Sequence, residues 1–169
     1  MRDFRILAVT IAVVLLDQLT KFWVKSALNL YQSVRVIGED FFRLTYIQND
    51  GIAFGLEFGG RTFLIIFTSL ALILLSYYLY TLRNSPLAPR FALAMILGGA
   101  LGNFIDRVFI GQVTDFFDFD FPDFIMTRWP VFNIADSAVS VGMTILVVYL
   151  VFFCKEEQLK TNSSPAAEN

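Results

Sequence analysis

Histidine is absent from the 169 residues of this chain, and cysteine occurs only once, as Cys154. The lack of histidine excludes a Ser-His-Asp triad, an imidazole-bound metal and the usual proton shuttle of enzymes. A single cysteine excludes an intramolecular disulfide, and we expect Cys154, at the end of an apolar run, to be a packed or interfacial thiol. Acid-base chemistry, if present, must therefore use other side chains.

Charge is also scarce, because charged residues make up 17% of the chain, the net charge is -2 and no basic run occurs. This balance excludes nucleic acid as a partner. Hydrophobic residues instead make up 56% of the chain, including 19 Phe, and the mean hydropathy is +0.63. Such a composition is typical of an integral membrane protein.

Four apolar segments predict four transmembrane helices, since each crossing needs about 20 mostly apolar residues. We place the helices at about residues 5–27, 62–82, 91–108 and 131–153. The first is interpreted as a retained helix and not a cleaved signal peptide, because Val24-Lys25-Ser26 is a poor cleavage site.

A small β element is predicted over about residues 33–58, where β-branched and aromatic residues flank a Gly-Glu-Asp turn and several glycines follow. The predicted fold class is mainly α: a four-transmembrane-helix bundle with a small extracytoplasmic β-sheet cradle between helices 1 and 2. Residues 111–130 are predicted to be a connecting loop. We expect one membrane domain over residues 1–154 and a polar, disordered cytoplasmic tail over residues 155–169.

Four crossings place both termini on one side of the membrane. The positive-inside rule favours the cytoplasm for that side, because basic residues cluster at the helix ends there, at positions 2, 5, 83, 90, 155 and 160. The sheet and the polar ends of the helices then lie on the outer side.

Polar groups inside these helices need partners or a use, since a charge at mid-membrane costs about 2.5–3.5 kcal/mol on insertion scales. Asp17 and Lys21 are four residues apart and share a helix face, which predicts an ion pair that anchors the helix or helps to position a substrate. The third helix ends in Asn103, Asp106 and Arg107, which either pack at a helix end or orient a carboxylate or a substrate carbonyl.

Asp115 and Asp136 are the strongest candidates for catalysis. The third helix leaves the membrane on the side where the fourth enters it, so both carboxylates are expected at the same depth. Asn133 lies three residues before Asp136 on the same face. Two interpretations remain open: an Asp-Asp dyad, or a solvated loop acid at 115 beside a helix N-terminal acid at 136.

A carboxylate dyad shares one proton, so one member can activate water while the other protonates a carbonyl oxygen. No cofactor and no metal are needed. The acidic loop lacks the central glycine and closing glutamate of a calcium-binding loop, which argues against a metal site. Lys25 and Ser26 point in different directions from a helix and make a poor Ser-Lys pair.

Five motifs resemble one family, the lipoprotein signal peptidases, also called signal peptidase II. They are Asp17-Gln-Leu-Thr-Lys21, Asn49-Asp-Gly-Ile-Ala-Phe-Gly55, Gly98-Gly-Ala-Leu-Gly-Asn-Phe-Ile-Asp-Arg107, Val113-Thr-Asp-Phe116 and Phe132-Asn-Ile-Ala-Asp-Ser137. Their order and spacing extend over residues 17–137, which makes the resemblance specific.

The resemblance implies a monomeric aspartic endopeptidase of the bacterial inner membrane that cleaves lipid-modified prolipoproteins just before the diacylglyceryl cysteine. It implies an active site near the periplasmic face, contact with membrane lipid and inhibition by the cyclic peptide globomycin. Asp115 and Asp136 would be catalytic, with Asp118 as the alternative to Asp115. The remaining implied site residues would contact substrate or support the dyad: Asn49, Gly51, Asn103, Asp106, Arg107 and Asn133, with Asp17 and Lys21 as structural support.

Two other classes remain open. A small transporter or assembly factor would use the charged helix residues as an ion or proton path, although these residues gather at one end of the helices. A purely structural four-helix subunit would tolerate neutral substitutions at Asp115 and Asp136.

Overall fold

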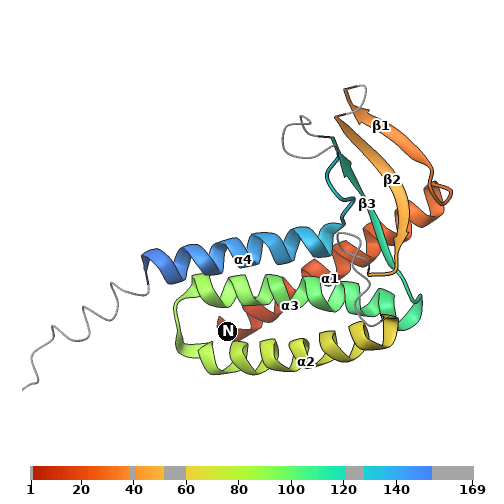
Figure 1. Ribbon diagram of the computed structural model, residues 1–169. Coiled ribbons are helices and arrows are strands. Elements are labelled where there is room, and N and C mark those ends of the chain that lie inside the picture. The colour runs from red at the N-terminus through yellow and green to blue at the C-terminus, as the bar shows by residue number, and fades with distance from the viewer. Residues whose placement is uncertain (1, 39–40, 52–59, 121–127, 154–169) are drawn as a thin grey trace, which may run out of the picture.

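This computed structural model describes residues 2–38, 41–51, 60–120 and 128–153 (Figure 1). Four helices within it are long and apolar enough to cross a membrane: α1 Arg2–Ala27, α2 Gly60–Thr81, α3 Leu87–Phe109 and α4 Ile134–Phe152. A short 3-10 helix, η1 Leu82–Asn84, follows α2. The predicted four-helix membrane fold is confirmed. Cys154, the tail over residues 155–169 and part of the predicted β element, residues 52–58, lie outside the described residues.

Helix α3 lies at the centre of the bundle and packs against α1, α2 and α4 (Figure 1). Its small residues permit this close contact. A Cβ atom added to Gly99 would lie 2.3 Å from the backbone oxygen of Ala135 in α4, and one added to Gly102 would lie 2.6 Å from Asp17 Oδ2 in α1. The glycines therefore let two neighbouring helices bring polar groups against α3.

Three antiparallel strands form one sheet in the order β1-β2-β3: β1 Ser33–Ile37, β2 Phe42–Asn49 and β3 Val113–Phe119. Strands β2 and β3 pair in a register that sets Ile47 opposite Asp115 and Asn49 opposite Val113. The predicted sheet is confirmed, but its third strand comes from the segment predicted to be a loop. The cradle is thus built from two of the inter-helix connections, the one between α1 and α2 and the one between α3 and α4. Strand β3 pairs with the edge of β2 that would otherwise be open.

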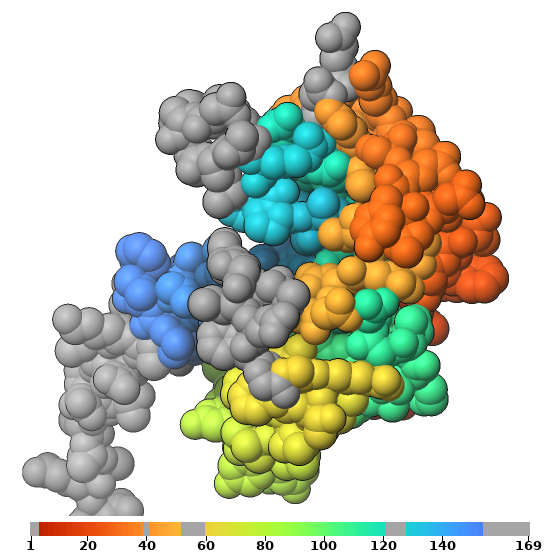
Figure 2. Space-filling view, turned by 45° about the vertical axis from the view of Figure 1, so that its right-hand side comes forward, coloured from red at the N-terminus to blue at the C-terminus, as the bar shows by residue number. Residues whose placement is uncertain are grey.

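The sheet lies at one end of the bundle, where α1 and α3 end and α2 and α4 begin (Figure 1). In the space-filling view, the end of β2 lies against the start of α2 and the end of α3 (Figure 2). Two hydrogen bonds connect these parts: Gln112 Nε2 donates to Asp50 Oδ1 (2.6 Å), and Arg61 Nε donates to the backbone oxygen of Arg107 (3.0 Å). The start of α2 is therefore tied to the end of α3, and the segment after β2 to the segment before β3.

Large apolar side chains cover the outer surface of the helices. Helix α2 contains no buried residue, and exposed residues such as Phe67 and Ile73 project from it. In water such a surface would be unstable, whereas lipid solvates it without cost. The fold is thus a multi-pass membrane protein with a polar cluster and a small sheet at one end.

Candidate active site

Asp115 lies on β3, and its side chain is only 2% exposed. The interpretation of this residue as a solvated loop acid is therefore wrong. Asn133 Nδ2 donates a hydrogen bond to Asp115 Oδ1 (2.6 Å), and Asn49 Nδ2 donates to Asp115 Oδ2 (3.0 Å). Both carboxyl oxygens are thus oriented by amide groups, one from the N-cap residue of α4 and one from β2.

Asp136 is half-buried in the first turn of α4, where Asn133 is the N-cap residue. The two residues form a capping box: Asp136 N donates to Asn133 Oδ1 (2.9 Å), and Asn133 N donates to Asp136 Oδ2 (3.1 Å). An asparagine followed three residues later by an acid favours this arrangement at a helix start. The helix N-terminus also stabilises negative charge at this position.

Two asparagine side chains connect the two carboxyl groups. Asn103 Nδ2 donates to Asp136 Oδ1 (2.8 Å), while Asn133 Nδ2, which holds Asp115, also lies 3.1 Å from Asn103 Oδ1. Asp115 and Asp136 come from segments on either side of one loop, and the structure brings them to the same amide pair. Each aspartate is in addition within electrostatic reach of the other.

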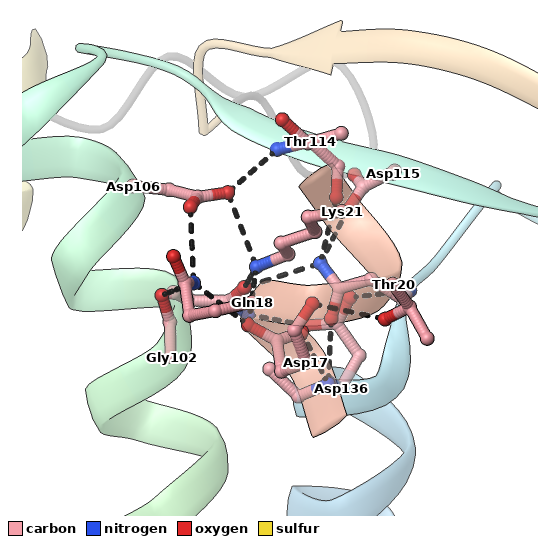
Figure 3. Close-up of polar contacts among 12 residues, drawn as sticks. Asp17, Gln18, Thr20, Lys21, Gly102, Asp106, Thr114, Asp115 and Asp136 are labelled. Carbon is pink, nitrogen blue, oxygen red and sulfur yellow. Dashed lines mark hydrogen bonds and ion pairs between the residues drawn. The ribbon is translucent and has the colours of Figure 1, made fainter. Parts of the chain in front are cut away.

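Lys21 occupies the interior next to this amide pair and is 1% exposed (Figure 3). Its Nζ lies 2.9 Å from Asp17 Oδ2 and 3.1 Å from Asp106 Oδ2, and donates to Asn103 Oδ1 at 2.8 Å. An ammonium group can only donate, so it requires the oxygen of the Asn103 amide. The amide nitrogen of Asn103 then points to Asp136. Lys21 thereby sets the direction of the hydrogen bond that holds one member of the acid pair.

Asp17 and Asp106 are both fully buried, and each has a second role. Asp17 Oδ1 accepts from the backbone N of Ala135 in the first turn of α4 (3.0 Å), and Asp106 Oδ2 accepts from the backbone N of Thr114 on β3 (3.0 Å). The predicted Asp17–Lys21 ion pair is present. It is part of a network that ties α1 to α3, α4 and β3.

Gln18 and Thr114 belong to the site but were not predicted. Gln18 Nε2 lies within 3.2 Å of Asp106 Oδ1 and 3.1 Å of Asp17 Oδ2 (Figure 3). Its position inside the Asp17–Lys21 motif, three residues before Lys21, is a signal that could have identified it. Thr114 contributes its backbone N–H, and no pattern of side chains reports such a contact.

Arg107 lies on α3, and its positive charge acts on Asp136, Asp115 and Asp106. Its Nε atom is buried and, among the described residues, has no hydrogen-bond partner. A buried guanidinium nitrogen without an acceptor is costly in the absence of a ligand. Arg107 is therefore placed to donate to a group that enters beside the two aspartates.

Asn49 and Gly51 connect the end of β2 to the site. Gly51 N donates to Asn49 Oδ1 (2.8 Å), which directs the amide nitrogen of Asn49 to Asp115. Gly51 has φ +93°, a left-handed conformation that favours glycine. The turn after β2 thus orients Asn49 much as Lys21 orients Asn103.

Asp118, the alternative to Asp115, lies elsewhere. Thr45 Oγ1 donates to Asp118 Oδ2 (2.5 Å) and Arg128 Nε donates to Asp118 Oδ1 (2.6 Å), so this carboxylate is paired away from Asp136. Among the described residues no group of three or more Cys, Asp or Glu could hold a metal ion. The arrangement supplies paired carboxyl groups for acid-base chemistry.

Burial raises the pKa of Asp115 from 3.8 to about 7, and the negative charge of Asp136 adds to this increase. Hydrogen bonds from Asn49 and Asn133 act in the opposite direction but are weaker. Asp115 therefore retains a proton at pH values where an ordinary aspartate has lost it.

A pH dependence follows from this pKa. The protonated form predominates below about pH 7, so activity that uses this proton should fall as the pH rises above 7. Because the unfolded chain ionises Asp115 near pH 3.8, the free energy of unfolding should also fall between about pH 4 and pH 7, by on the order of 4 kcal/mol. Asp115→Asn mimics the protonated side chain and should remove this slope.

Thermal unfolding of both proteins in detergent between pH 4 and pH 8 measures the slope. Equal pH dependence in the wild type and the Asp115→Asn variant would contradict the raised pKa.

Fold and site together define a multi-pass membrane protein with two neighbouring carboxyl groups at one end of its helix bundle. A solved structure described as "Bacterial membrane enzyme structure by the in meso method at 2.3 A resolution" matches 98% of this chain and 94% of its own, with a TM-score of 0.76 and 30% identity. A second, described in the same words at 1.9 Å, matches with a TM-score of 0.75 and 33% identity, over 88% of this chain and 94% of its own.

The family model described as "Signal peptidase (SPase) II" matches residues 9–152. Lipoprotein signal peptidase from Syntrophus aciditrophicus is 43% identical over 150 residues, which cover 86% of this chain and 91% of the relative. That from Halothermothrix orenii is 41% identical over 142 residues, covering 84% and 92%. The chain belongs to the signal peptidase II family, as its motifs predicted.

Proposed function

We propose that this chain is a membrane-embedded aspartic endopeptidase that removes the signal peptide from diacylglyceryl-modified prolipoproteins immediately before the lipidated cysteine. Membership of the signal peptidase II family implies cleavage of prolipoprotein signal peptides. The observation that carries the proposed chemistry is the amide pair Asn103–Asn133, which joins the carboxyl groups of Asp115 and Asp136.

In the proposed mechanism Asp115 carries the shared proton and Asp136 is the base. Asp136 takes a proton from water, the water oxygen attacks the scissile carbonyl carbon, and Asp115 gives its proton to the carbonyl oxygen. In the second half Asp136 passes the proton to the leaving nitrogen as the C–N bond breaks, and Asp115 recovers a proton from the hydroxyl group. The pKa of about 7 at Asp115 supports this division of roles.

Neighbouring groups would hold the substrate. Arg107 Nε, buried without a partner in the described part of the chain, would donate to a backbone carbonyl of the substrate. Asn49 and Gly51 would form part of a cradle at the end of β2, and Asn103, Asn133 and Asp106 would keep the dyad oriented.

The proposed setting is the bacterial inner membrane. The start of α1 and the end of α4 lie at the end of the bundle away from the sheet (Figure 1). We assign that end to the cytoplasm and the dyad to the periplasmic face, with one membrane domain over residues 1–154, a cytoplasmic tail and a monomeric state. The proposed chemistry needs no cofactor.

Incubation of the purified chain with two precursors, one diacylglyceryl-modified and one unmodified, tests the substrate. We expect cleavage of the modified precursor alone, with a product whose N-terminal residue is the lipidated cysteine by mass spectrometry. A globomycin-type cyclic peptide should inhibit the reaction. Equal cleavage of both precursors would contradict the proposal, and ion flux in proteoliposomes without cleavage would favour a transporter.

A further inference from the structure

A cavity of about 410 Å³ lies between α1, α2 and α3, at the end of the bundle opposite the sheet. Both α1 and α2 pack against α3, and the cavity lies in the space between α1 and α2 on that side of α3. Its lining consists of residues from these helices and η1: Ile6, Leu7, Ser76, Leu79, Tyr80, Arg83, Arg90 and Leu97. It is separate from the carboxyl pair, and nothing in the proposed mechanism uses it.

The walls of this cavity are apolar along most of their length. Ile6 from α1, Leu79 from α2 and Leu97 from α3 contribute aliphatic side chains. From Arg90 to Leu97, seven residues of helix span about 10 Å at 1.5 Å per residue. An apolar slot of this length in a membrane helix bundle fits the first part of a lipid acyl chain.

Two arginines, by contrast, contribute positive charge at the end of the cavity that lies farther from the sheet. Arg90 is 1% exposed near the start of α3, and Arg83 lies in η1, with its guanidinium 4.7 Å from the centre of the Tyr80 ring. A planar guanidinium group suits the oxygens of a phosphate, to which it can donate two hydrogen bonds.

These features match the two parts of one kind of molecule. An anionic glycerophospholipid carries a phosphate at the membrane interface and an acyl chain below it. Tyr80 and the two arginines lie at helix ends, which is where such headgroups are found. A zwitterionic lipid would bring a second, positive group toward the arginines and fit less well.

We propose that this cavity binds one anionic glycerophospholipid, with its phosphate on Arg83 and Arg90 and an acyl chain along Ile6, Leu79 and Leu97. The bound lipid connects α2 to α1. This has a structural purpose, because α2 buries no residue of its own within the described chain and packs mainly on α3.

Native mass spectrometry of the purified, delipidated full-length protein tests the site. Phosphatidylglycerol and phosphatidylcholine with identical acyl chains are added separately. We expect tighter retention of phosphatidylglycerol by the wild type, and a loss of about fivefold for each of Arg83→Gln and Arg90→Gln. Arg35→Gln, an exposed arginine on β1 at the other end of the molecule, is the matched control and should bind as the wild type does.

Two further experiments separate the contribution of the lipid phosphate from that of the acyl chain. Ser76→Trp keeps both arginines but fills the apolar slot, so it should also weaken retention. Glycerol 3-phosphate, which lacks acyl chains, should not compete with the lipid. Equal retention of both lipids by the wild type, wild-type retention in both Arg83→Gln and Ser76→Trp, or full competition by glycerol 3-phosphate would each overturn the proposal. Because Arg83 is exposed, Arg83→Gln remains decisive if Arg90→Gln does not fold.

Discussion

Asp136→Asn should leave the protein folded and lower the rate of precursor cleavage by about 10²- to 10⁴-fold, the usual contribution of a general acid or base. The amide keeps the size of the side chain but cannot accept a proton from water. Asp115→Asn should have an effect of similar size, because it removes the proton that would go to the carbonyl oxygen. The rate of cleavage of a diacylglyceryl-modified precursor, at saturating substrate, is the measurement.

Asp118→Asn is the matched control for these two variants. Asp118 lies on the same strand as Asp115 and is 4% exposed, but its carboxylate pairs with Arg128. This variant should cleave at close to the wild-type rate, with any loss confined to stability. Full activity in Asp115→Asn or Asp136→Asn would exclude the dyad, and would instead favour a structural role for these acids.

Lys21→Met should lower the free energy of unfolding by about 3–5 kcal/mol, as expected when one partner of a buried ion pair is removed. Methionine preserves much of the volume but leaves the carboxylates of Asp17 and Asp106 in the interior without a cation. Asn103 also loses the donor that sets the direction of its amide. Chemical or thermal unfolding in detergent measures the loss of stability.

Lys25→Met, one turn further along α1, is the control, since Lys25 is only partly buried and forms no ion pair with any residue that the structure describes. The combined variant Asp17→Asn, Lys21→Met, Asp106→Asn should recover part of the lost stability, because no buried charge remains uncompensated. Equal stability of Lys21→Met and Lys25→Met would show that the buried network contributes nothing to folding.

The four helices were predictable because a lipid environment requires long apolar segments, and the sequence contains four of them. The helix ends were less certain. The fourth helix was predicted from residue 131, whereas α4 begins at Ile134, because Asn133 caps it with its side chain. The polar residues near the helix ends could also be named from the sequence, since intramembrane polar groups are few and each needs a partner. Asn49 and Gly51, by contrast, were implied only by the resemblance to the family.

Strand β3 could not be predicted in the same way. Its sequence, Val113 to Phe119, contains two acids, and acids are depleted in strands. Asp115 is tolerated there because amides from Asn49 and Asn133 bond its oxygens, and Asp118 because Thr45 and Arg128 do. These partners are distant in the sequence, so local propensity carries no information about them.

The sequence by itself determined the number of membrane crossings, the absence of histidine and disulfide chemistry, and which few polar residues had to share one end of the bundle. Only the tertiary structure decided which of these residues meet. The directions of the amides of Asn103 and Asn133 depend on Lys21, Asp115 and Asp136, which come from three separate elements. Hydrogen bonds act over about 3 Å. Distances of that size between different elements are set by how the helices pack against one another, which no pattern within a single helix determines.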